Sequence, residues 1–251
     1  MNVSVDLNAD LGEGASHDAD LFELISSANI ATGFHAGDAD TMHAAVSTAK
    51  ACGVAVGAHP SFFDREHFGR KELKVTADEV FDAVAFQLGV FQAIAEAAGM
   101  RPNHVKPHGA LYNMAARDEK IAEAIARATK SVDAKLILFA PDNSALACAG
   151  ESHGLQIARE VFADRNYLSD GSLVPRSRAD ALLDDPEEAA VRVLRMLRAG
   201  KVRSVEGDDV DVRAETICVH GDTPGAVEFA RELRSQLESQ GVRISAPQIL
   251  L

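Results

Sequence analysis

Polar side chains recur along this chain where short apolar segments give way to polar turns. They are carboxylates, imidazoles, amides, arginines, a tyrosine and a lysine. Segment 3–7 is followed by Asn8, Asp10 and Glu13, segment 29–34 by His35 and Asp38, and segment 54–58 by His59 and Asp64. Segment 103–106 contains Lys106 and is followed by His108, Tyr112 and Asn113. Segment 155–162 contains Glu160 and is followed by Asp164 and Arg165, and segment 216–219 is followed by His220 and Asp222. Groups of these types transfer protons, stabilise negative charge or bind a divalent metal.

Two chemistries are open for such a set. Asp10 with His35, His59 or His108 would suit a divalent metal that activates water, because neutral imidazole and carboxylate are zinc-type ligands. If a metal is bound, Asp10, His59 and His108 are its expected ligands. In the metal-free alternative, Asp10 or Glu13 acts as a general base and a histidine with a pKa near ~6.5 shuttles the proton. No His-Glu-x-x-His or Cys-x-x-Cys motif decides between them.

Lys106 has two interpretations of equal weight. An ammonium at the end of an apolar segment could stabilise an oxyanion or a phosphoryl group. A buried lysine is also usually paired, and Asp10 or Glu160 would be its partner in a salt bridge. The sequence leaves both roles open.

The histidines divide by their position relative to the apolar segments. A single histidine is more often a hydrogen-bonded structural residue than a catalyst. Four histidines at the ends of four different segments instead favour one shared pocket, and they are His35, His59, His108 and His220. The remaining histidines are interpreted as surface or packing residues: His17, His43, His67, His104 and His153.

Three arginines in the presumed loops suggest an anionic ligand. Arg70, Arg165 and Arg176 are suited to bidentate capture of a carboxylate or a phosphate. The sequence has no phosphate-binding P-loop and no Gly-x-Gly-x-x-Gly fingerprint, so nucleotide binding would need another architecture. A serine nucleophile elbow and a cysteine nucleophile motif are also absent.

The apolar segments alternate with stretches of helical periodicity, which predicts the frame that positions these residues. Thr76 to Glu79 form a capping-box signature, and Pro follows a capping residue at Asp185–Pro186 and at Thr223–Pro224. About seven or eight strand–helix units in 251 residues favour a single (β/α) barrel over an open doubly wound sheet. In a barrel, the carboxyl ends of the strands gather on one face, where the active site lies. No linker interrupts the series, so residues 1–251 are expected to form one domain.

Composition excludes several partners and indicates a compartment. With 25 Lys and Arg against 38 Asp and Glu, the formal charge is −13, which disfavours nucleic acids and anionic membrane surfaces. No secretory signal is visible, and no apolar run approaches the ~18 residues of a membrane span. Cys52, Cys148 and Cys218 lie in apolar segments and are expected to be reduced core residues of a cytoplasmic protein.

Seven segments in chain order resemble the LamB/YcsF family. They are VDLNADLGE (5–13), ATGFHAGD (31–38), GAHPS (57–61), VKPHGALYN (105–113), EVFADR (160–165), DGSLVPR (170–176) and VHGD (219–222). One departure is His67, where a glycine is expected; it concerns the path of that loop and the role of Arg70. The family is similar in fold to the irregular (β/α) barrels of the glycoside hydrolase and deacetylase superfamily.

The resemblance implies a subunit of an ATP-dependent 5-oxoprolinase, which works with two further subunits to open 5-oxo-L-proline to L-glutamate. ATP, with Mg²⁺, would be the cosubstrate. The implied catalytic residues are Asp10, Glu13, His35, His59, Lys106, His108, Glu160 and His220. The implied substrate-binding residues are Asn8, Arg70, Tyr112, Asn113, Arg165 and Arg176. The alternatives are a metal-dependent deacetylase or amidohydrolase of the same superfamily and a non-catalytic subunit of a multisubunit enzyme.

Overall fold

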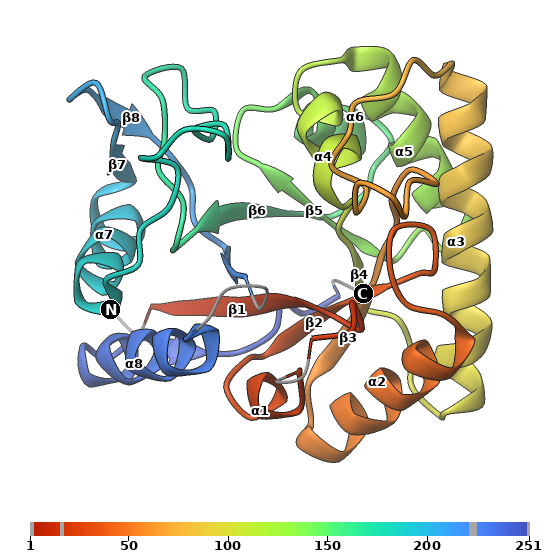
Figure 1. The fold of residues 1–251 in the computed structure, drawn as a ribbon, viewed down its shortest axis with the longest axis horizontal. Helices are drawn as coiled ribbons and strands as arrows, with labels where there is room; N and C mark the ends of the chain where they lie inside the picture. The colour runs from red at the N-terminus through yellow and green to blue at the C-terminus, as the bar shows by residue number, and fades with distance from the viewer. Residues whose placement is uncertain (1–2, 16–17, 221–224, 250–251) are drawn as a thin grey trace.

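A closed barrel of seven parallel strands forms the centre of the molecule (Figure 1). The computed structural model describes residues 3–15, 18–220 and 225–249. In order around the barrel the strands are β1 (Ser4–Leu11), β2 (Ser27–Ala31), β3 (Ala55–His59), β4 (His104–Val105), β5 (Ile137–Pro141), β6 (Ile157–Phe162) and β9 (Thr216–Val219). Closure occurs because β9 pairs with β6 on one side and with β1 on the other. The predicted single (β/α) barrel is therefore confirmed.

Within the described ranges, three further strands lie outside this ring. β10 (Arg243–Ile244) pairs in parallel with the start of β1. β7 (Lys201–Arg203) and β8 (Asp209–Asp211) form an antiparallel hairpin between α7 (Pro186–Ala199) and β9. The sequence pattern gave no sign of this hairpin, which makes the barrel irregular in the last part of the chain.

Helices surround the barrel, as Figure 1 shows. They are α1 (Asp18–Phe22), α2 (Ala39–Cys52), α3 (Ala77–Ala97), α4 (Gly109–Ala115), α5 (Glu119–Val132), α6 (Ala145–Ser152), α7 (Pro186–Ala199) and α8 (Ala226–Ser239). The predicted capping box is present at α3, where the Thr76 hydroxyl and the Glu79 carboxylate satisfy each other's backbone N–H groups. Pro186 opens α7 as predicted. The predicted start at Thr223–Pro224 lies outside the described residues.

Two expectations about the surface need correction. By length and composition α3 is the one helix in the described ranges that could cross a membrane, a criterion that the core helix of a soluble protein also meets. It packs against α5 and α2 through a face that includes Val84 and Leu88. Of the cysteines, Cys218 is buried in the barrel, but Cys52 and Cys148 are exposed because they lie on the outer faces of α2 and α6.

The interior of the barrel is polar along β1. Asp6 and Asn8 of β1 and Asn29 of the adjacent β2 are buried there, where (β/α) barrels usually carry branched apolar side chains. Asp6 accepts hydrogen bonds from the hydroxyls of Ser26, Ser27 and Thr216 at 2.6–2.8 Å. Burial nevertheless raises the pKa of Asp6 to about 6. Side chains that point into the barrel thus form a hydrogen-bonded floor beneath the strand ends.

Candidate active site

Two adjoining groups of side chains meet at the carboxyl ends of the strands. The first, termed the lysine cage, comprises Lys106 and the residues around its ammonium: Asn8, Asp10, Glu160 and Cys218. The second, termed the histidine cluster, comprises Glu13, His35, His59 and His108. Asp10 joins them, because one of its oxygens faces Lys106 and the other faces His59.

The lysine cage surrounds an ammonium that is only 3% exposed. Lys106 Nζ lies 2.9 Å from Asp10 Oδ1, 3.0 Å from Glu160 Oε1 and 3.0 Å from Cys218 Sγ. Burial alone would lower the pKa of Lys106, but Asp10, Cys218 and Glu160 outweigh it and hold the pKa well above its ordinary value. Burial likewise opposes ionisation of Asp10, yet interactions with His59 and Lys106 bring its pKa well below the usual range. Lys106 is therefore a permanent cation.

This geometry decides between the two interpretations of Lys106. An ammonium has three donors, and in the cage it has acceptors at Asp10, Glu160 and Cys218, with Asn8 Oδ1 at 3.3 Å. The salt bridges to Asp10 and Glu160 are present, and no donor remains for a substrate oxygen. Lys106 is thus a positioning residue for the two carboxylates.

The histidine cluster combines three buried imidazoles with one carboxylate. Glu13 Oε1 lies 2.9 Å from His35 Nε2, 3.4 Å from His108 Nδ1 and 3.9 Å from His59 Nε2. The rings of His35 and His108 are stacked, with centroids 3.9 Å apart. Burial lowers the pKa of His35, and burial together with His35 and His59 lowers that of His108 well below its ordinary value. His35 and His108 are therefore neutral at physiological pH.

Backbone carbonyls fix the orientation of two of these rings. His59 Nδ1 lies 2.6 Å from the carbonyl oxygen of Lys106, and His108 Nε2 lies 2.9 Å from that of Phe68. A carbonyl can only accept, so both of these nitrogens carry a proton. The other two nitrogens, His59 Nε2 and His108 Nδ1, face each other at 2.9 Å.

A left-handed turn places the Phe68 carbonyl under His108. Phe68 has φ of 55° and Gly69 has φ of 64°. A Cβ on Gly69 would collide with the Ser61 hydroxyl and with His35, so glycine is required there by contact as well as by conformation. His67, where a glycine was expected, points outward and is bonded to Asp64, so it leaves this turn intact.

A histidine–aspartate pair lies on the other side of the lysine cage. His220 Nδ1 is 2.7 Å from Asp164 Oδ2, and the His220 ring stacks on Phe162. An imidazole nitrogen of His220 also lies within 4.8 Å of Asp10 and Cys218 ligand atoms. A cleft of about 470 Å³, bordered by α7 and α8, opens beside Asp164 and His220. This pair is suited to proton transfer, since Asp164 orients the ring.

The predicted arginines have different roles. Arg165 is buried and donates to the backbone oxygens of Val174 and Ala181, so it holds its own loop together and does not offer its guanidinium to a substrate as expected. Burial opposes ionisation of Asp164, but His220 and, more weakly, Arg176 hold the pKa of Asp164 below its ordinary value. Arg70 lies over the Phe68 ring at 5.0 Å. These last two arginines border the two halves of the site.

Other predicted residues divide in the same way. Tyr112 donates to Glu160 Oε2 at 2.6 Å and so helps to hold the Glu160 carboxylate in the lysine cage. Asn113 is exposed on α4, where no described contact links it to the site. Asp38 caps α2, and Asp64 accepts from His67, and no described hydrogen bond or ion pair joins either carboxylate to the lysine cage or the histidine cluster. Asp222 lies outside the described residues.

Sequence reasoning missed the residues that support the site from below. Asn29 donates to Asn8 and to Asp10 at 2.7 and 2.8 Å, and His104 lies 2.8 Å from Asn29 Oδ1. Burial lowers the pKa of His104 to about 3, so this histidine is neutral. Gly57 faces the His104 ring, where any Cβ would collide with it. The interpretation of His104 as a packing residue is correct. Through Asn29, which donates to Asp10, His104 also helps to position the Asp10 carboxylate.

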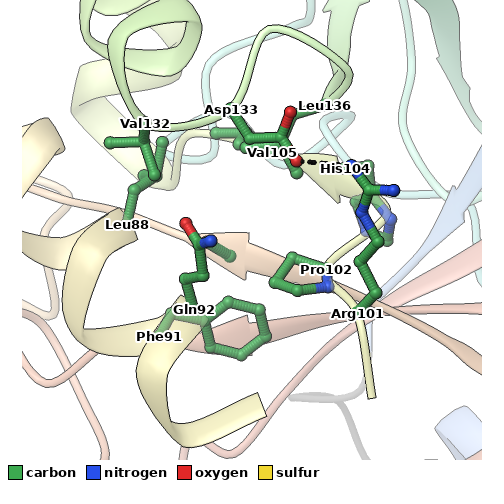
Figure 2. A pocket seen from close by; sticks show the side chains of 11 residues that line it. Leu88, Phe91, Gln92, Arg101, Pro102, His104, Val105, Val132, Asp133 and Leu136 are labelled. Atoms are coloured by element: carbon green, nitrogen blue, oxygen red, sulfur yellow. Dashed lines mark hydrogen bonds and ion pairs between the residues drawn. The ribbon is translucent and has the colours of Figure 1, made fainter. Parts of the chain in front are cut away.

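A second pocket lies elsewhere and is too small for a substrate. Figure 2 shows it between Phe91 and Gln92 of α3, the segment at Arg101 and Pro102, and the end of α5 at Val132. Its volume is about 10 Å³, which is room for a single water. The Arg101–Asp133 ion pair of 2.8 Å closes one side.

The fold and the site together define a (β/α)-barrel protein with a histidine–carboxylate centre at the carboxyl ends of its strands. The model of the LamB/YcsF family matches residues 5–250, and the chain belongs to this family. A lactam utilization protein from Thermus thermophilus is similar over 98% of this chain and 100% of its own, with 44% identity and a TM-score of 0.91.

More distant structures share the fold. A putative cellobiose-phosphate cleavage protein from Enterococcus faecalis is similar over 98% of this chain and 97% of its own, with 14% identity and a TM-score of 0.57. A family 4 carbohydrate esterase from Streptomyces lividans covers 98% and 94%, with 12% identity and a TM-score of 0.51. These likenesses concern the barrel alone.

Proposed function

We propose that this protein opens the lactam ring of 5-oxo-L-proline to L-glutamate, as the barrel subunit of an ATP-dependent 5-oxoprolinase with two further subunits. The observation that carries the proposal is the full-length likeness, at 44% identity, to a protein that is named for lactam utilization. The site supports it, because carboxylates and imidazoles suited to proton transfer converge at the strand ends.

The reaction makes definite chemical demands. A five-membered lactam is a poor acyl donor, so transfer of the terminal phosphoryl group of ATP to its oxygen, releasing ADP, would activate the carbon. Water then adds to that carbon and loses a proton to a base. The C–N bond breaks as the nitrogen takes up a proton, and a second water hydrolyses the resulting acyl phosphate. The Mg²⁺ that accompanies ATP would belong to the phosphoryl-transfer step.

The described residues can meet these demands. Asp10 or Glu13 would accept the proton of water, and Lys106 keeps Asp10 ionised. His220, oriented by Asp164, would donate to the departing nitrogen. Arg70 or Arg176, at the two borders of the site, would bind the substrate carboxylate. Such an ATP-consuming reaction would take place in the cytoplasm, in keeping with the three free cysteines.

Reconstitution tests the proposal. The chain is mixed with the products of its neighbouring genes, 5-oxoproline and Mg-ATP, and glutamate and ADP are measured. We expect glutamate from the full mixture, and its loss with Asp10→Asn or His220→Gln. His43→Gln, on an exposed turn of α2, is the matched control and should retain activity. Absence of glutamate from a full mixture of folded subunits would refute the proposal.

The histidine cluster favours a second candidate, a metal-dependent amide hydrolase of the deacetylase type. This activity would need neither ATP nor partners. Acetate release from N-acetylated sugars by the chain alone, with added Zn²⁺, would support it and count against the lactam reaction. A third candidate, a non-catalytic subunit, predicts no heat of binding when 5-oxoproline is titrated into the chain.

A further inference from the structure

We infer that Glu13, His35, His59 and His108 form a tetrahedral binding site for a divalent transition metal of the zinc type. This inference goes beyond the proposed function and does not depend on it. The site is separate from any Mg²⁺ that accompanies ATP, because three of its four ligands are imidazole nitrogens, whereas Mg²⁺ takes oxygen ligands.

The first step of the argument concerns hydrogens. The carbonyls of Lys106 and Phe68 take the protons of His59 Nδ1 and His108 Nε2, so the opposite nitrogen of each ring, His59 Nε2 or His108 Nδ1, is the one that faces the cluster. Those two nitrogens are 2.9 Å apart in a buried space, and Glu13 Oε1 lies within 3.9 Å of both. A divalent cation at this point would be bound by both nitrogens and by the carboxylate at once.

The second step concerns distances. A tetrahedral ion with bonds of about 2.0–2.1 Å to nitrogen and oxygen has neighbouring ligand atoms about 3.4 Å apart. The separations around the cluster are 2.9, 2.9, 3.4 and 3.9 Å, for His59–His108, His35–Glu13, His108–Glu13 and His59–Glu13. They bracket the tetrahedral value. Small side-chain rotations would therefore complete the coordination.

The third step concerns rigidity. Metal-bound imidazoles usually donate their other N–H to a carbonyl or carboxylate, which fixes ring orientation. His59 and His108 both do so, and His35 is held by stacking on His108. The turn at Phe68 and Gly69 supplies one of those carbonyls at the cost of a left-handed non-glycine residue. Such a constraint fits a site whose ligands must be held in place.

The neighbouring set of Asp10, Cys218 and His220 does not compete for the ion. Its ligand atoms also lie within 4.8 Å of one another, but the Lys106 ammonium is 2.9 Å from Asp10 and 3.0 Å from Cys218. A cation already occupies that position. The carboxylate of the metal site is therefore Glu13, and Asp10 stays beside it as an ionised neighbour.

When bound, a zinc-type ion polarises carbonyl groups and lowers the pKa of water, which either candidate reaction could use. Its identity follows from the donors. Three imidazoles and one carboxylate suit Zn²⁺ or Co²⁺, whereas Mg²⁺ requires octahedral oxygen ligands.

The test measures binding and not turnover. Chelator-treated protein is titrated calorimetrically with Zn²⁺, with Mg²⁺ as a comparison, and Co²⁺ is added while visible absorption is recorded. We expect one tight Zn²⁺ equivalent, no Mg²⁺ binding at the same concentrations, and the intense absorption of tetrahedral Co²⁺. His35→Ala and His108→Ala should each weaken Zn²⁺ binding at least a hundredfold, while His43→Gln should bind as the wild type does.

Three outcomes would overturn the inference. A wild-type chain that binds no Zn²⁺ would mean that a proton on one ring fills the gap between His59 and His108. Equal binding by wild type and both alanine variants would place the ion elsewhere, and weak octahedral Co²⁺ absorption would exclude the geometry. If an alanine variant fails to fold by circular dichroism, Glu13→Gln replaces it. Glutamate formation plays no part in these measurements, so failure of the lactam proposal would leave them unaffected.

Discussion

Replacement of Lys106 by methionine should destabilise the protein, because it leaves the buried carboxylates of Asp10 and Glu160 without their cation. Lys106→Met keeps most of the side-chain volume but removes the ammonium from between Asp10 and Glu160. Removing one partner of a buried ion pair typically costs about 3–5 kcal/mol, because the remaining charge is uncompensated. We expect a loss in that range at pH 7.5 in urea unfolding followed by circular dichroism.

The stability cost of Lys106→Met should change with pH, in a direction that follows from the pKa of Asp10. In the wild type the folded-state pKa of Asp10 is depressed, so its contribution is present above the unfolded pKa of about 3.9 and lost as the pH falls through the lower folded value. Without Lys106, burial of Asp10 is opposed chiefly by His59, so the pKa of Asp10 is depressed less than in the wild type. The cost of Lys106→Met should then be largest near pH 8 and shrink as the pH falls far enough to protonate Asp10 in the variant.

The matched control is Lys201→Met. Lys201 Nζ lies 2.9 Å from Asp211, the same separation as Lys106 and Asp10, but this pair is exposed. Exposed pairs are worth about 0–1 kcal/mol, so the control should change little. Combining Lys106→Met with Asp10→Asn should recover part of the loss. Equal small effects for the two methionine variants, or a cost that does not shrink at low pH, would refute the reasoning.

Three further predictions concern single side chains. The pKa of Asp6 is raised to about 6, so between pH 4 and 6 the folded state keeps a proton that the unfolded state loses. Wild-type stability, measured by urea unfolding, should therefore fall as the pH rises through this range. Asp6→Asn should remove this contribution and so reduce the fall by up to about 3 kcal/mol. Gly69→Ala should cost more than Gly53→Ala, because both residues are left-handed but only Gly69 meets neighbouring side chains; melting temperatures compare the two. Asp164→Asn should leave the fold intact and lower glutamate formation at least tenfold, since His220 loses its orienting carboxylate; full turnover would show that the pair is structural.

The sequence predicted the barrel and the convergence of polar side chains at its strand ends, because both depend on local signals. Apolar segments followed by polar turns mark strand ends, and parallel strands bring those ends to one face. His35, His59 and His108 do converge, and His220 lies across the lysine cage from them. Helix starts such as Thr76 were readable because a cap is a contact between residues three apart.

Features that depend on strand register, or on how far a long side chain extends, could not be predicted from the sequence. Asn29 and His104 lie within or beside apolar segments, and only the pairing of Asp10 with Asn29 across β1 and β2 shows that they point inward and support the carboxylate. Arg165 was expected to bind substrate, but a long side chain can reach backbone oxygens of its own loop just as well. Whether Lys106 is saturated depends on distances that no sequence pattern contains.

The pairing of β1 with β9 has a consequence for how the protein is made. Asp10 lies on β1 and His220 directly follows the neighbouring strand β9, more than two hundred residues later in the chain, so the ring cannot close until β9 has left the ribosome. Contacts of such long sequence separation form late and slow folding. Before closure, β1 and β6 expose unpaired edges that can join other chains. A chain shortened before Thr216 would therefore retain every member of the histidine cluster yet be prone to aggregate, and its ligands would have no closed barrel to hold them.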